Sequence, residues 1–258
     1  MSPRPLGICL PLILIWLMGW APFSWAGGEA APESKTPSLR CHTCGQPILG
    51  AYYKIPGLPE LYCEKCYKTL PHCFYCGRPF RFAVKGSKPV CESCRAEAVN
   101  NTEEALRIVQ RVRTWIESNL ALQLPRRIEF RFVEDLAPYV GVQLSGRTRE
   151  LGAYIREGNQ VRILLLSGMP RPTLIEAAAH ELAHVWQAGR IPRNQRLLLK
   201  EGFAQWVAAK ALVGFDCQSA MRVLAQREDL YGEGYRHIKD IEDRGGVEGT
   251  LTYVKQTE

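Results

Sequence analysis

The sequence lacks any long apolar run after its first 26 residues. A membrane-spanning helix needs about 20 consecutive apolar residues, and no stretch beyond Ala26 approaches this length. We therefore expect no transmembrane domain there. The chain is also too short, at 258 residues, for two large domains, so one substantial domain with small modules is expected.

The single long apolar run stands at the N-terminus. After Arg4, residues 6–20 are uncharged and apolar, and a Ser-x-Ala triplet follows at residues 24–26. This layout is typical of a signal peptide, residues 1–26, that is cleaved after Ala26. We expect a secreted or periplasmic protein without stable membrane insertion after cleavage. The alternative is an uncleaved anchor that holds the protein outside the cytoplasm.

Residues 27–39 are small and polar and include proline, which predicts a linker. The composition then changes, because residues 40–97 contain eight of the ten cysteines. This segment is an internal repeat in which residues 41–48 return as 73–80 and residues 63–66 return as 91–94. Each copy holds four thiols. The first set is Cys41, Cys44, Cys63 and Cys66, and the second set is Cys73, Cys76, Cys91 and Cys94.

The Cys-x-x-Cys spacing has a physical reason. Two cysteines separated by two residues can turn both sulfurs onto one metal ion, and a glycine after the second allows a tight turn. The repeat therefore predicts two structural zinc sites of four thiolates each. His42 and His72 have no counterparts in the repeat and are not assigned as ligands.

An oxidising compartment favours disulfides, so a disulfide framework is the competing interpretation. Bridging close Cys-x-x-Cys pairs internally would be strained and would constrain little chain. We therefore favour zinc.

The chain also has little excess charge once these ligands are considered. The formal charge of +7 counts every cysteine as neutral. Eight thiolates and two zinc ions change it by −8 and +4, and signal removal takes away Arg4, which leaves roughly +2. The charge therefore implies no nucleic-acid partner.

Residues 98–258 are predicted to form a second, mostly helical domain with a small antiparallel sheet. Apolar residues recur at steps of three and four from Leu106 to Leu120, and residues 157–160 have the composition of a hairpin turn. The expected strands are 128–132, 152–156 and 161–166, and the expected helices are 102–120, 173–188, 194–213, 217–228 and 232–243.

The motif His180-Glu181-Leu182-Ala183-His184 lies in one of these predicted helices. Histidines four residues apart share one helix face and can bind one zinc ion. The glutamate after the first histidine can act as a general base. A downstream glutamate on the next helix would complete the ligand set, and Glu201 stands at this position. The sequence thus predicts a catalytic zinc bound by His180, His184 and Glu201, with Glu181 as the base.

Further residues are candidates for stabilising an oxyanion, a role for which tyrosine and histidine donors are suited. Tyr231, Tyr235 and His237 lie near the end of the chain, where they could reach the site. Trp186 and Trp206 are expected in the core instead.

Tandem four-cysteine sites followed by this zinc motif resemble the plant growth-regulating, LIM-containing, ubiquitin-activated peptidases and their bacterial relatives. The resemblance rests on the cysteine pairs, on residues 179–184 and on Glu201-Gly202-x-x-Gln205. It departs from the LIM pattern in one spacing. Six residues separate Cys66 from Cys73, where LIM domains usually have two residues between their zinc sites. It implies an α+β chain, with a tandem zinc-ribbon or LIM-like module before a zincin-like, gluzincin-type peptidase domain.

The expected function is therefore hydrolysis of a protein or peptide substrate, with the module used for recognition. LIM modules mostly bind proteins, so a non-catalytic adaptor is the alternative, and a metal-binding remnant without turnover is a third. The sequence carries no acidic ubiquitin-interacting helix. Ubiquitin biology, substrate identity and oligomeric state are not assigned.

Overall fold

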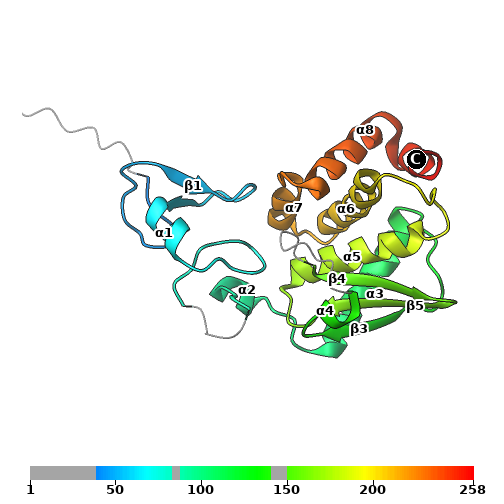
Figure 1. Cartoon of the computed structure of the whole chain (residues 1–258), viewed down its shortest axis with the longest axis horizontal. Helices are drawn as coiled ribbons and strands as arrows, with labels where there is room; N and C mark the ends of the chain where they lie inside the picture. Colours follow the sequence, from blue (N-terminus) through cyan, green and yellow to red (C-terminus); the bar gives the residue numbers. More distant parts are fainter. Residues whose placement is uncertain (1–38, 83–87, 141–149) are drawn as a thin grey trace, which may run out of the picture. The chain divides into compact units, whose positions relative to one another are not determined.

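The computed structural model describes residues 39–82, 88–140 and 150–258 (Figure 1). This part of the chain is a mixed α+β structure, and about half of its residues are helical. The predicted signal peptide, residues 1–26, and the predicted linker up to residue 38 lie outside the described ranges. Among the described helices, none is long and apolar enough to span a membrane.

The cysteine-rich segment consists of short elements. Strands β1 (Tyr52–Lys54) and β2 (Leu61–Cys63) form an antiparallel hairpin that leads directly into helix α1 (Glu64–Thr69). Helix α2 (Glu92–Ala96) follows the third cysteine of the second set, as α1 follows the third cysteine of the first. The repeat in the sequence is therefore also a repeat in the structure.

A glycine turns the chain tightly after the second cysteine of each set. Gly45 and Gly77 have positive φ angles, 73° and 74°, which a residue with a Cβ rarely adopts. Their amides donate to the carbonyl oxygens of Cys41 and Cys73 at 2.8 and 2.9 Å. The tight turn expected from the sequence is present in both copies.

The C-terminal segment begins with helix α3 (Thr102–Asn119), as predicted. The side chain of Asn101 caps it by accepting a hydrogen bond from the Glu104 amide at 3.0 Å. The helix buries a stripe of apolar residues that includes Val109, Val112 and Ile116, which is the periodicity seen in the sequence.

A three-stranded sheet follows, in the order β3-β5-β4. The predicted hairpin is confirmed, because β4 (Gly152–Glu157) pairs antiparallel with β5 (Gln160–Leu166). The prediction of an entirely antiparallel sheet is wrong, because β3 (Glu129–Val133) pairs parallel with β5. Parallel pairing needs a crossover connection. The chain between β3 and β5 contains the short helix α4 (Ala137–Val140) and the whole of β4, and it is long enough to provide one.

Four helices complete this segment, in the order that the sequence predicts. Helix α5 (Arg171–Gln187) packs against α3, β4 and β5, and α6 (Leu197–Gly214) packs between α5 and α8 (Figure 1). Helix α7 (Gln218–Ala225) is short, and α8 (Leu230–Gln256) continues beyond the predicted end through a kink at Gly246. The two helices that carry His180, His184 and Glu201 therefore lie at the centre of the segment.

The aromatic core lies between α5 and α6. Trp186 and Trp206 are buried, as predicted, and Phe203 lies between them with ring centroids 5.1 and 5.6 Å away. Polar contacts join α6 to α8, since Glu242 accepts hydrogen bonds from Trp206 Nε1 at 2.9 Å and from Lys210 Nζ at 2.7 Å.

Two glycines allow α6 and α8 to touch through their backbones. A Cβ at Gly202 would lie 2.5 Å from the carbonyl group of Gly234, and a Cβ at Gly234 would lie 2.6 Å from Gly202 Cα. A glycine beside Glu201 in the sequence is equally compatible with a close approach of α6 to α5, the helix of the histidine motif. The structure assigns this close approach to α8 instead, because Gly202 faces α8.

Gly202→Ala is expected to destabilise the protein by roughly 2–3 kcal/mol, because backbone atoms of α8 cannot yield to the added methyl group. The control is Gly249→Ala, since a Cβ at this helical position meets nothing within 4 Å. That change should be neutral or stabilise by up to about 1 kcal/mol. Urea denaturation followed by circular dichroism measures both, and equal stability of the two variants would contradict the close contact.

Candidate functional site

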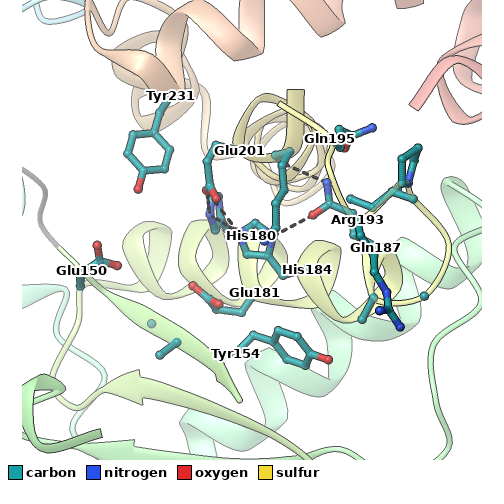
Figure 2. A pocket seen from close by; sticks show the side chains of 17 residues that line it. Glu150, Tyr154, His180, Glu181, His184, Gln187, Arg193, Gln195, Glu201 and Tyr231 are labelled. Atoms are coloured by element: carbon teal, nitrogen blue, oxygen red, sulfur yellow. Dashed lines mark hydrogen bonds and ion pairs between the residues drawn. The ribbon is translucent and has the colours of Figure 1, made fainter. Parts of the chain in front are cut away.

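The structure brings the three predicted zinc ligands together. His180 and His184 stand one turn apart on α5, and their Nε2 atoms are 3.1 Å from each other. Glu201 reaches them from α6, with Oε2 at 3.2 Å from His180 Nε2 and 3.4 Å from His184 Nε2 (Figure 2). These side chains offer one ligand atom each, and the three atoms lie within 4.8 Å of one another.

Gln187, which the sequence analysis did not single out, fixes the tautomer of His184. Its Nε2 donates to the carbonyl oxygen of Lys200 at 2.9 Å, so its Oε1 is the atom that faces His184 Nδ1 at 2.8 Å. An amide oxygen only accepts, and the Nδ1 atom must therefore carry the proton. A neutral His184 then directs the lone pair of Nε2 towards His180 and Glu201.

The convergence of lone pairs shows that the residues fit a metal ion. An unprotonated nitrogen beside a carboxylate oxygen repels it unless a cation lies between them. Burial lowers the pKa of His184, but the hydrogen bond with Glu201 and the charge of Glu181 outweigh it, and the net pKa is raised. The site therefore favours positive charge, which a proton or a metal cation can supply.

The same contacts lower the pKa of Glu201. Burial raises the pKa of its carboxyl group, but the contacts with His180 and His184, which favour the charged carboxylate, outweigh this effect and leave the pKa well below its ordinary value. The carboxylate is thus held in its charged form, which is the form that binds a cation.

Glu181 lies on the side of the ligands that faces β4 (Figure 2). Its side chain packs on Gly152, where a Cβ would lie 2.8 Å from Glu181 Cγ and 3.0 Å from Oε1. A glycine at position 152 therefore leaves the space that the carboxyl group occupies. Burial raises the pKa of Glu181, while the neighbouring histidines act in the opposite direction.

These residues line a cleft of about 430 Å³. Gly152, Ala153 and Tyr154 of β4 form one wall, and the turn between α5 and α6 closes part of the other. Within the described sheet, β4 has a strand neighbour on one side only, so it is an edge strand. Its free side can pair with an extended peptide.

Of the three candidate oxyanion donors, Tyr231 alone is among the described residues that line the cleft. Its ring centroid lies 5.9 Å from that of His180, and its hydroxyl points into the cleft (Figure 2). Burial and the charges of Glu201 and Glu150 raise the pKa of Tyr231 to about 12, so the hydroxyl keeps its proton.

The other two candidates lie elsewhere on α8. Tyr235 is buried in the core, and His237 Nε2 lies 3.2 Å from the hydroxyl of Tyr253. Their proximity to Tyr231 in the sequence was therefore misleading, because Tyr235 stands about one turn further along α8 and His237 faces another side of the helix.

Arg227 holds Tyr231 in place and was also missed. Its guanidinium lies 4.8 Å from the centre of the Tyr231 ring, and it pairs with Asp229 at 2.6 Å. Asp229 caps α8 by accepting a hydrogen bond from the Gly232 amide at 3.1 Å. The Arg-x-Asp spacing just before a predicted helix was the available signal, although the contact with the ring depends on the tertiary structure.

The eight predicted cysteine ligands form two clusters, as expected. In each cluster the four sulfurs lie within 4.8 Å of one another, and each cluster could hold a structural metal ion. None of the eight cysteines is in a disulfide, and representative sulfur pairs, Cys44 with Cys63 and Cys76 with Cys91, are 3.9 and 3.6 Å apart. Both distances exceed a disulfide bond of about 2.05 Å.

A backbone amide supports one of these sulfurs, since the Cys91 N–H donates to Cys73 Sγ at 3.4 Å. His42 and His72 stay outside the clusters, as predicted. His42 packs edge-on against Tyr62, and His72 Nε2 is 2.7 Å from the carbonyl oxygen of Tyr67.

Comparison with known proteins does not add a relationship to this geometry. The chain matches no family model, no curated protein and no solved structure.

Gln187→Leu is expected to weaken metal binding at the His180, His184 and Glu201 site by about 10–100-fold, because His184 loses the hydrogen bond that orients it. Competition with a fluorescent zinc chelator measures the affinity. The control is Gln110→Leu, which makes the same replacement on an exposed face of α3. An unchanged affinity in Gln187→Leu would mean that the amide does not control the ligand.

Proposed function

We propose that the protein is a zinc metallopeptidase that hydrolyses peptide bonds outside the cytoplasm. The observation that carries the proposal is the convergence of His180 Nε2, His184 Nε2 and Glu201 Oε2 beside a buried glutamate, in a cleft bordered by an edge strand. Each part has a separate role in hydrolysing an extended peptide, and together they favour catalysis over simple metal storage.

His180, His184 and Glu201 would hold the metal ion. Zinc bound by these three residues supplies a Lewis acid that polarises a carbonyl group and lowers the pKa of water. Glu181 accepts a proton from the attacking water and delivers it to the leaving amine. Its position against Gly152 supports this role, since the carboxyl group is held between the ligands and the strand that binds the peptide backbone.

Tyr231 supplies the hydrogen bond to the oxyanion in this proposal. The phenol keeps its proton at neutral pH, and the contacts of the ring with His180 and Arg227 fix its direction before substrate arrives. A donor that is already oriented stabilises developing charge without further reorganisation.

The cysteine module has a different role. Two clusters of four sulfurs can each hold a zinc ion that maintains the fold, and such small modules present surfaces for protein recognition. We propose that it recruits or orients a protein substrate. The resemblance to LIM-containing peptidases rests on the same residues and is part of this proposal.

Metal content and activity together test the proposal. The wild-type protein is expected to bind three zinc ions per chain, one for each ligand group, and His180→Ala is expected to bind two. Glu181→Gln should keep three and lose roughly 10²–10⁴-fold in peptide hydrolysis, because it removes the general base alone. Elemental analysis and cleavage of a proteome-derived peptide library provide the two measurements.

Other outcomes separate the alternatives. Two zinc ions in the wild-type protein, with no effect of Glu181→Gln, would favour an adaptor. Three zinc ions without cleavage of the library would identify a metal-binding remnant. Zinc-free protein with four disulfides would overturn the interpretation of the cysteines.

Tyr231→Phe should lower kcat by roughly 100-fold with little change in KM or zinc content, because the missing hydroxyl acts on the oxyanion. Tyr235→Phe removes the same atom from the same helix outside the cleft and should retain activity. A rise in KM without a fall in kcat would assign Tyr231 to substrate binding instead.

A further inference from the structure

The cleft has charges of opposite sign at its two ends. Figure 2 shows Glu150 at one end and Arg193 at the other, with the three ligands and Glu181 between them. A second basic residue, Lys200, also lines the cleft. Arg193 comes from the turn before α6, and Lys200 is the residue directly before Glu201.

Among the described residues, Arg193 and Lys200 have no acidic partner of their own. Both are exposed, and in the described part of the chain no ion pair joins either side chain to a carboxylate. When a divalent cation is bound, the carboxylates of Glu181 and Glu201 balance its charge. Arg193 and Lys200 are then the described basic residues of the cleft lining whose charge no ion pair compensates.

Hydrogen bonds fix the backbone that carries both side chains. The Lys200 carbonyl oxygen accepts from Gln187, the residue that orients His184. Gln195 holds the turn that carries Arg193. Its backbone N–H donates to the backbone carbonyl oxygen of Pro192 at 3.1 Å. The side chain of Gln195 donates to carbonyl oxygens near the end of α8 at 2.8 Å. The backbone that carries the Arg193 and Lys200 side chains is therefore fixed relative to the metal ligands.

The direction of β4 indicates which part of a peptide reaches them. The chain runs along β4 from Gly152 past Tyr154, away from the end with Glu150 and towards the end with Arg193 (Figure 2). Antiparallel pairing is more stable and more common than parallel pairing. A peptide paired in this way with β4 has its N-terminal side at Arg193.

We propose that Arg193 and Lys200 form a subsite for an Asp or Glu side chain on the N-terminal side of the scissile bond. This inference rests on the proposed peptidase function and names its substrate class. Both basic groups are partly solvated, so the subsite selects among peptides instead of determining binding by itself.

Cleavage-site mapping tests the subsite in the zinc-loaded full chain. A chymotryptic peptide library from a denatured bacterial proteome is digested, and the new termini are identified by mass spectrometry. Wild-type sites should be enriched in Asp or Glu at one position N-terminal to the scissile bond. The charge-reversal variant Arg193→Glu/Lys200→Glu should lose this enrichment and favour Lys or Arg there. The matched control, Arg107→Glu/Arg244→Glu, changes the net charge equally at exposed positions and should keep the wild-type preference.

A binding measurement keeps the test independent of turnover. N-acetyl tripeptide hydroxamates, with Glu or Gln at one position and Ala elsewhere, place their side chains N-terminal to the metal-binding group. In the zinc-loaded Glu181→Gln protein, one Glu compound should bind about ten-fold more tightly than its Gln counterpart. Adding Arg193→Glu/Lys200→Glu should abolish the difference, while the zinc content stays unchanged.

The two measurements distinguish failure of the subsite from failure of the proposed function. Cleavage without an acidic preference on the N-terminal side, or with the same preference after charge reversal, overturns the subsite and leaves the peptidase function intact. Selective binding of the Glu hydroxamate without any cleavage supports the subsite and overturns the peptidase function. Equal binding of the Glu and Gln compounds at every position overturns the subsite.

Discussion

Three lone pairs directed at one point between α5 and α6 are the constraint around which the C-terminal segment is built. His180, His184 and Glu201 lie close enough to repel one another unless a cation shares the space. Gln187 links the helices at this point, because it holds His184 and the backbone of Lys200 with the two ends of one amide group. The fold thus fixes the donor atoms of the site from two separate helices.

Much of the site could be predicted because its chemistry is local in sequence. Histidines four residues apart must share a helix face, and the repeated Cys-x-x-Cys-Gly pattern implies the same turn twice. The hairpin and the order of the helices could also be predicted, because alternating apolar and polar residues mark strands and apolar residues at steps of three and four mark helices. Both patterns are local in sequence. Glu201 required one further assumption, that the next helix folds back on the first, and the geometry meets it.

The parts that could not be predicted depend on contacts between distant segments. The alternation of apolar and charged residues identified β3 as a strand. It carries no information about the direction of β3 relative to β5, which the crossover connection sets. Gly202 was noticed, but a glycine does not specify its partner, and here the partner is on α8. Tyr231, Tyr235 and His237 were equivalent in the sequence, and their positions along and around α8 distinguish one from the others.

The backbone contact between Gly202 and Gly234 has a mechanical consequence. Side chains between helices can change rotamer and absorb small displacements, but two glycines leave nothing to adjust. Gly202 is the neighbour of Glu201, and Gly234 lies on the same helix as Tyr231, three residues further along. This direct backbone contact contains no side chain that could take up a displacement of α8, so the backbone beside Glu201 would have to move with it.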